Sequence, residues 1–505
     1  MAIFNKIGVG ILLAGLLACR VGATSVQIND LPSFSLDGIG LSSVFDSSVW
    51  RGSVDVTSLS ERVKTVGRLP LGRTEREVLR QLLITDTSAE PALADGDGSF
   101  WKARVEALAS QGFYEEIIAL VDQVPAVLQT SNMKKQRAEA LFGSGQIHEA
   151  CREVMMPLWG EQENAVRAAC AFYQGTADEA RLAFDVYREG GGQDAWITAA
   201  STQLFEGKGK APEGVPEIWA VGLAGAAFGG DVLSGMSRGM LRAVALNSKV
   251  SVDVRVAAAE KTILSQSDWS RVLSGVEKTN VTEKVQKNTV SERIQLYQKT
   301  FSVSEEKRVD AIHQLIKAVR EANVTEAWAP VLTDMVLGVD VQSNRESIAA
   351  DMIVINAWAN DVTAAHDWYV VLADKNAVAA LRLSPILNAM GAGVPKSVDP
   401  LVRACVADGN CDVVLRDIPF YFPVSPDVAL SIRPTSFGYA GFVTGAIQKQ
   451  MAEGQIGNGL LNGLELLSRS HVTERPLVET MAKVLPHDLG DALLRERLLR
   501  GLSSR

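Results

Sequence analysis

Two stretches of this sequence have residue types and spacings that are found at catalytic or metal sites. Residues 235–239 (GMSRG) match the G-x-S-x-G pattern that presents a nucleophilic serine. That chemistry requires a strand that delivers the serine to a sharp turn, with Asp and His arriving later in the chain. The segment before Gly235 is rich in Ala and Gly and has a helical pattern. We therefore interpret GMSRG as a turn between helices and predict no catalytic residue.

The second stretch has oxygen-bearing side chains in the order of a calcium loop. Asp95, Asp97, Ser99 and Glu106 stand where such a loop places ligands, but Phe100 occupies the position that needs glycine for the sharp turn. A helix N-cap at Asp97 or Ser99 is the simpler interpretation. A similar alternation at 408–412 lacks the closing glutamate.

The histidines and paired acids give no further site. No histidine stands in H-x-x-x-H spacing or beside a cysteine, and no glycine-rich loop follows a strand pattern. Acidic pairs such as those at 115–116 and 305–306 are typical of solvated helix faces. The sequence therefore predicts no metal, no cofactor and no enzyme activity.

Cysteine spacing points to an oxidising compartment. Four of the five cysteines form two sequence-local pairs, Cys151 with Cys170 and Cys405 with Cys411. The first pair lies on helices that we expect to pack as neighbours, and the second would close a short loop. We predict two local disulfides, with four buried thiols as the alternative.

The elements around these residues repeat. GFYEEI at Gly112, GQIHEA at Gly145 and GTADEA at Gly175 share a glycine followed four positions later by glutamate, and a degenerate copy begins at Gly207. The copies recur roughly every 30 residues, an interval typical of paired-helix repeats. Glycine permits the left-handed conformation that ends a helix, so each is predicted to form the turn of a helical hairpin. GQIGNG at Gly454 predicts one more hairpin near the C-terminus.

This pattern resembles the tetratricopeptide repeat, although the copies lack its closing proline. The residues that fall on signature positions are Trp101, Tyr114 and Ile117 in the first copy, Ala138, Leu141 and Ala150 in the second, and Ala168, Ala171 and Ala180 in the third. The resemblance implies stacked hairpins with a concave groove that holds a protein or peptide, and it implies no chemistry. The whole chain also resembles secreted helical-repeat proteins of alphaproteobacteria, which implies a place in the cell envelope.

The N-terminus has the pattern of a secretory signal. Lys6 precedes a short apolar segment, and Val-Gly-Ala at 21–23 fits the small-residue cleavage rule. LLAC at 16–19 offers a second interpretation, a lipoprotein box with Cys19 as the lipidated residue. We expect a periplasmic protein that meets a membrane only if Cys19 is lipidated.

Composition agrees with a large helical protein. The 505 residues are 47% hydrophobic and only 6% aromatic, and the formal charge of −9 excludes the basic surface that nucleic acids require. The longest apolar run after the signal, 218–228, is too short to span a bilayer and predicts one buried helix.

We therefore predict an all-α fold, an α-α superhelix of stacked hairpins. The expected order is a signal peptide (1–23), an irregular arm (24–56), a helical pair and loop (57–98), tetratricopeptide-like repeats (99–210), degenerate repeats (211–410), a Pro-rich linker (411–436) and C-terminal hairpins (437–505). Helices are expected at 58–66, 74–83, 326–337, 345–358, 364–373, 376–390, 397–407, 475–484 and 488–501.

Such an array predicts a non-catalytic scaffold that binds an envelope protein or peptide in its groove. Binding of peptidoglycan or another polysaccharide is the alternative. Aromatic side chains exposed in a row would favour the polysaccharide, and aromatic side chains confined to helix contacts would favour the protein.

Overall fold

The fold is taken from a computed structural model. It describes residues 39–52, 55–88, 98–154, 159–274, 276, 286–337, 339, 346–392, 439–469 and 475–503. The chain divides into two compact units, Met1–Phe34 and Ser35–Arg505, and all described residues belong to the second. Cys19, Cys405, Cys411 and the predicted helix at 397–407 lie outside the described residues.

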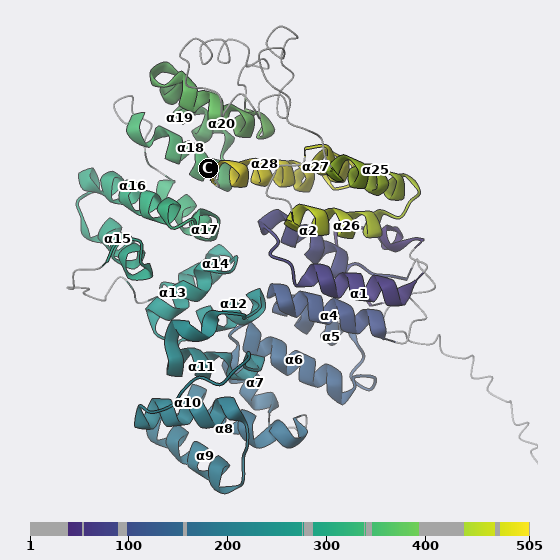
Figure 1. The fold of residues 1–505 in the computed structure, drawn as a ribbon, viewed down its shortest axis with the longest axis vertical. Coiled ribbons are helices and arrows are strands. Elements are labelled where there is room, and N and C mark those ends of the chain that lie inside the picture. The colour runs from purple at the N-terminus through teal and green to yellow at the C-terminus, as the bar shows by residue number, and fades with distance from the viewer. Residues whose placement is uncertain are drawn as a thin grey trace, which may run out of the picture. The chain divides into compact units, whose positions relative to one another are not determined.

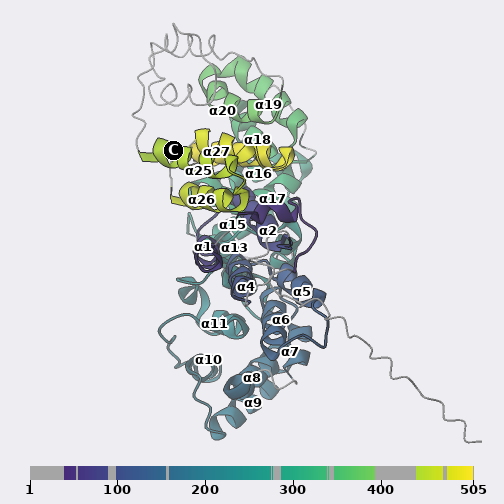
Figure 2. The same cartoon turned by 90° about the vertical axis from the view of Figure 1, so that its right-hand side faces the viewer.

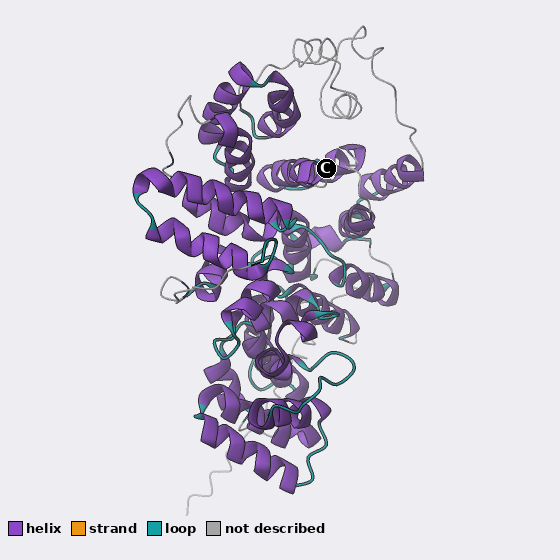
Figure 3. Cartoon of the chain, turned by 60° about the vertical axis from the view of Figure 1, so that its left-hand side comes forward, coloured by secondary structure: helices purple, strands orange, loops and turns teal. Residues whose placement is uncertain are grey.

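The described residues form helices joined by loops, with no strand among them (Figure 3). Helices adjacent in sequence pack against each other along most of the chain, as in a helical solenoid. The predicted all-α class is therefore confirmed. No described helix has both the length and the apolar character needed to cross a membrane.

The arm before the first helix is anchored in the core. A 3-10 turn, η1 (Ser47–Trp50), buries Trp50 completely, and the indole packs edge-on against Phe100 with ring centroids 5.3 Å apart. Arg104 is also fully buried and donates hydrogen bonds to the carbonyls of Leu83 (2.6 Å) and Ile39 (2.7 Å). The described part of the predicted irregular arm is thus fixed to the helices that follow.

The repeat region consists of helix pairs in the predicted order (Figure 1). After α1 (Val56–Gly67) and α2 (Arg73–Ile84) come α4 (Ser99–Gln111) with α5 (Tyr114–Gln123), α6 (Ser131–Gly143) with α7 (Ile147–Glu153), and α8 (Glu163–Gln174) with α9 (Ala177–Glu189). Most of the aligned signature residues, among them Trp101, Tyr114 and Ala150, are buried in these contacts. The apolar spacing of three to four residues therefore lies on the packed faces, as the sequence indicates.

The turn glycines do not all behave alike. Gly112, Gly145 and Gly454 have φ values of +82°, +74° and +84°, the predicted left-handed conformation, and Gly207 has +69°. After each of the first three, the N–H of the residue that follows the glycine bonds to a carbonyl five residues back, for example Phe113 to Leu108 (2.9 Å).

Gly175 departs from the prediction, because its φ is −87° and its backbone is extended. The N–H of Thr176 bonds to the Glu179 carboxylate (2.7 Å) in a capping box that begins α9, so it is not available to close the previous helix. An added Cβ at Gly175 would stand 2.6 Å from the Ala171 carbonyl oxygen, so crowding still favours glycine there.

The middle of the chain continues as helices. They are α10 (Ala195–Glu206), η3 (Ile218–Ala220), α11 (Val221–Phe228), η4 (Gly229–Leu233), α12 (Arg238–Leu246), α13 (Val252–Glu260), α14 (Gln266–Val272), α15 (Val290–Ser302), α16 (Glu305–Glu321), α17 (Thr325–Val336), α18 (Glu346–Ala359), α19 (Val362–Lys375) and α20 (Ala377–Ala389). The single helix predicted at 218–228 begins as the 3-10 turn η3, which carries Trp219 into the core.

The C-terminal helices return to the first helices of the chain. They are α25 (Tyr439–Ala452), α26 (Ile456–Arg469), α27 (Arg475–Ala482) and α28 (His487–Ser503). Helix α26 packs on η1, α1 and α2, while α28 contacts α2, α18 and α20, and both views place them together (Figures 1 and 2). One hydrophobic cluster therefore contains both Val49–Ala140 side chains and Ile447–Leu493 side chains.

Candidate functional site

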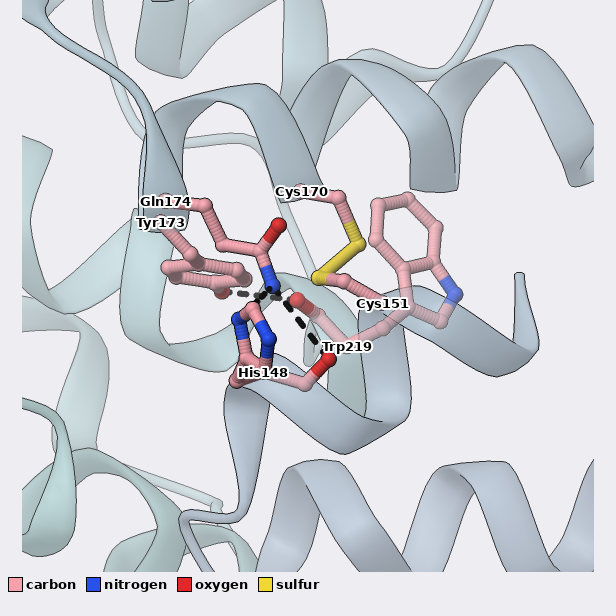
Figure 4. The surroundings of a disulfide bond; sticks show 6 residues. All are labelled: His148, Cys151, Cys170, Tyr173, Gln174 and Trp219. Carbon is pink, nitrogen blue, oxygen red and sulfur yellow. Dashed lines mark hydrogen bonds between the residues drawn. A yellow bond between two sulfur atoms is a disulfide. The ribbon is translucent and has the colours of Figure 1, made fainter. Parts of the chain in front are cut away.

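The disulfide that the sequence predicted joins two successive helix pairs. Cys151 on α7 and Cys170 on α8 form an S–S bond of 2.09 Å, with Cα atoms 5.6 Å apart (Figure 4). Each cysteine is less than a tenth exposed, at 7% and 8%. A buried bond of this kind staples packed helices and is poorly placed for thiol exchange with a partner.

Hydrogen bonds beside the disulfide link the same pairs to the following segment (Figure 4). The Tyr173 hydroxyl donates to the Trp219 carbonyl (2.7 Å) and accepts from the Leu223 N–H (3.1 Å). Burial raises the pKa of Tyr173, so the phenol stays protonated and keeps donating. Gln174 meets the His148 ring at 3.2 Å on the exposed side. This cluster fixes helices and contains no nucleophile with an adjacent base.

The face made by the first helix of each pair is covered by the same chain. Helix α12 packs on α4 and α6, η3 packs on α6 and α8, and α11 packs on α8. The contact of α12 is close, since an added Cβ at Gly239 would overlap the Ala109 carbonyl oxygen. Because α4, α6 and α8 would line the groove of a tetratricopeptide array, the helices of this chain cover the place where that groove would be.

Arg242 holds α12 in that position. Its guanidinium forms two 2.7 Å hydrogen bonds to the Glu115 carboxylate on α5 and bonds to Asp268 on α14 at 3.0 Å. It also donates to the Gly112 carbonyl (2.8 Å) at the first repeat turn. Two carboxylates raise the pKa of Arg242 against the effect of burial. The residue is a structural cation shared by three helices.

A second charge cluster joins helices that are far apart in sequence. The Glu75 carboxylate on α2 forms ion pairs with Arg497 (2.6 Å) and Arg500 (3.4 Å) on α28. The contact with Arg497 is an ion pair whose geometry is not that of a hydrogen bond. Arg500 also bonds to Glu326 on α17 at 2.6 Å. Burial opposes ionisation of Glu326, but Arg500 and the other groups that favour the carboxylate together have the larger effect, and the pKa of Glu326 is lowered. Glu496 accepts from the Thr74 N–H (2.7 Å).

The motifs considered for chemistry have structural roles where they are described. Ser237 of GMSRG is the N-cap of α12, and its hydroxyl accepts from the Met240 N–H (3.3 Å). Gly235 has a φ of +80° and makes the preceding turn. Asp95, Asp97 and residues 408–412 lie outside the described residues. Among the residues that are described, no three His, Cys, Asp or Glu side chains gather in a metal-binding group.

Among the described aromatic side chains, Phe301 is 48% exposed, but the tryptophans are buried or partly buried. Eight of the nine tryptophans are buried, and Trp196 is partly buried with its ring 6.2 Å from that of Phe228. Several large aliphatic side chains are exposed instead. On α9, Leu182 is 65% exposed and Val186 is 60% exposed, one helical turn apart on the same face.

Sequence reasoning found the Cys151–Cys170 pair but missed both charge clusters. Glu75, Glu326 and Arg500 are ordinary helix charges in the sequence, and only a contact between distant segments makes them partners. No local pattern could have identified them.

Comparison with known proteins does not identify site residues either. Comparisons with family models, with curated proteins and with solved structures found no match to this chain.

Proposed function

We propose that the protein is a non-catalytic scaffold of the cell envelope that binds another protein through the exposed outer face of α9. The contrast between buried tryptophan and exposed aliphatic side chains carries this proposal. The face of α4, α6 and α8 is already covered by η3, α11 and α12, so the partner surface is sought on the second helices of the pairs.

Aromatic burial favours a protein partner over a polysaccharide. Stacking on sugar rings needs exposed aromatic faces, and eight of the nine tryptophans are buried. Their indoles contribute to the hydrophobic clusters of the helix pairs instead. Binding of peptidoglycan through an aromatic row is therefore the weaker hypothesis.

The outer face of α9 suits a protein partner. Leu182 and Val186 stand on the face opposite Phe184 and Tyr187, which are buried against α8 and α10. Arg181 and Arg188 flank the two aliphatic side chains and are exposed. An apolar pair bordered by charges matches the centre and rim of a small protein interface.

The Cys151–Cys170 bond supports the envelope location. Disulfides persist in the periplasm and are rare in the cytosol. The proposal therefore places the scaffold outside the cytoplasm, where the sequence also predicts it.

Site-specific photocrosslinking tests the proposal. A photoreactive residue at position 182 of the tagged full chain should capture a defined protein in intact cells. In the double variant Leu182→Glu, Val186→Glu the photoreactive group is placed at the neighbouring position 181. This variant should lose the crosslinked product, because two charges would be desolvated at the contact. Val370→Glu is the matched control, since Val370 is 55% exposed on α19 and should leave capture unchanged.

Capture that persists in the double variant would contradict the proposed surface. Recovery of cell-wall fragments without a protein product would favour the polysaccharide hypothesis instead.

A further inference from the structure

A polar pocket lies where the N-terminal helix α1 meets the turn between α25 and α26. Its volume is about 210 Å³. Apart from Leu59, the lining residues have polar side chains; the set is Asp55, Ser58, Leu59, Arg62, Gln450, Gln455 and Asn458. The α1 residues recur at intervals of three and four and therefore form one face of that helix.

The turn that closes the pocket is the predicted hairpin GQIGNG. Gly454 adopts φ +84°, and the N–H of Gln455 bonds back to the Gln450 carbonyl (3.0 Å). This conformation places Gln455 and Asn458 against α1. Gly457 permits close approach of the same turn to η1, because an added Cβ there would stand 2.9 Å from the Val49 carbonyl oxygen.

The pocket contains hydrogen-bond donors that have no partner among the described residues. Within the described part of the chain, the side chains of Arg62, Gln455 and Asn458 form no hydrogen bond or ion pair, and each is only partly exposed. By contrast, Lys64 on the same helix pairs with Glu61, and Arg68 at its end pairs with Glu106. Arg62, beside two free amides, therefore has no carboxylate acceptor among the described residues.

Asp55 does not supply that acceptor. Its carboxylate caps α1 by accepting from the N–H groups of Thr57 (3.1 Å) and Ser58 (3.3 Å) and from the Ser58 hydroxyl. The hydrogen bonds from Ser58 hold the pKa of Asp55 below its usual range. Arg62 stands two turns further along α1 and forms no ion pair with it.

We propose that this pocket binds the carboxylate group of a ligand, with Arg62 as the main contact and Gln455 and Asn458 as additional donors. The planar guanidinium matches a carboxylate through two parallel hydrogen bonds. The volume equals that of roughly seven molecules of liquid water. A pocket of this size suits the terminal group of a ligand more than a whole drug-sized molecule. The ligand is a polypeptide C-terminus or a small free carboxylate. The inference stands on the pocket and does not depend on the α9 surface.

Calorimetric titration of the full chain tests this assignment. The probes are a pool of N-acetylated tripeptides covering all twenty C-terminal residues, the same pool with amidated C-termini, and free alanine. The acid pool should bind and the amidated pool should not. Arg62→Gln should weaken binding by roughly 10- to 100-fold, as expected for a lost charge-assisted pair. Asn458→Ala should weaken it less.

Arg68→Gln is the matched control, because its side chain is 67% exposed on the same helix and lies outside the pocket. It should bind the acid pool like the wild type. All variants should unfold at the wild-type temperature, since none removes a buried contact.

Tighter binding of the peptide acids than of alanine would identify a polypeptide terminus, and equal binding would identify a small carboxylate. Equal binding of acids and amides, no binding of any probe, or unchanged affinity in Arg62→Gln would overturn the proposal.

Discussion

Cys151 and Cys170 show how one covalent bond can act on a chain of helix pairs. The two residues are 19 positions apart, and each belongs to a different pair. Helix pairs in such arrays are stabilised mainly by contacts with their neighbours. A bond across a pair boundary therefore stabilises the contact that holds the array together, as well as restricting the unfolded chain.

Removing this disulfide should destabilise the oxidised protein by about 3 kcal/mol, the value expected for a loop of this length. Urea unfolding of Cys151→Ser, with and without reductant, measures the effect. Wild-type protein should lose stability when it is reduced, while the variant should respond little. Equal midpoints for the oxidised wild type and the variant would contradict a stabilising role.

Glu139 on α6 is the carboxyl group whose titration should affect stability near neutral pH. Burial raises its pKa from 4.5 to about 7, and Lys135 at 3.8 Å offsets this only in part. The folded protein therefore binds this proton more tightly than the unfolded chain does. The stabilisation is complete below pH 4.5 and is lost as the pH rises through 7.

Glu139→Gln should therefore be more stable than wild type at pH 8 and similar to it at pH 4.5. We expect a difference of about 1 kcal/mol at pH 8, because the side chain is 30% exposed and solvent reduces the effect. Unfolding midpoints across this pH range measure it. A difference that does not change with pH would show that Glu139 does not titrate as proposed.

At the scale of helices, glycines set how closely elements approach. Gly239 brings α12 against α4, and Gly67 brings α1 against Ala107 on α4. In both places an added Cβ would overlap the neighbouring helix. The close approach of α12 also buries Arg242 beside Glu115 and Asp268.

Gly239→Ala should destabilise the protein by about 2 kcal/mol or more, because a backbone carbonyl cannot move aside as a flexible side chain can. Hydrogen exchange should increase at the α4–α12 contact. Gly230→Ala is the control, since nothing lies within 4 Å of the added Cβ. A harmless Gly239→Ala would mean that α12 can shift without loss of its contacts.

Across the whole described unit, the last helix joins segments that are hundreds of residues apart. Helix α28 contacts α2, α18 and α20, and Arg500 bonds to Glu326 on α17. An added Cβ at Gly72 would overlap the Arg500 guanidinium, so a side chain there would have to displace this group from its present position. These contacts add long-range connections to a fold that is otherwise built from neighbouring helices.

Glu75→Gln should destabilise the protein by about 3 kcal/mol, because the buried Arg497 would lose its carboxylate while Arg500 would keep only Glu326. Hydrogen exchange should increase in α2, α17 and α28 together. Glu465→Gln removes only an exposed pair with Arg469 and should cost less than 1 kcal/mol. Faster exchange in α28 alone would contradict a shared network.

The sequence alone determined the local elements. Its apolar spacing located most of the predicted helices that are described within a few residues, for example the helix predicted at 74–83, which is α2 (Arg73–Ile84). Its glycine spacing located the hairpin turns, and its cysteine spacing identified the bond between Cys151 and Cys170. These features depend on residues close together in the chain, so a linear pattern contains them.

Only the tertiary structure decided what covers each helix face. The covering of α4, α6 and α8, the return of α26 and α28 to α1 and α2, and the pocket around Arg62 all require segments distant in sequence to meet. Amphipathic helices can bury their apolar faces against many partners, because the hydrophobic effect is not directional. Close packing and the pairing of buried charges select one arrangement, and both depend on the whole chain.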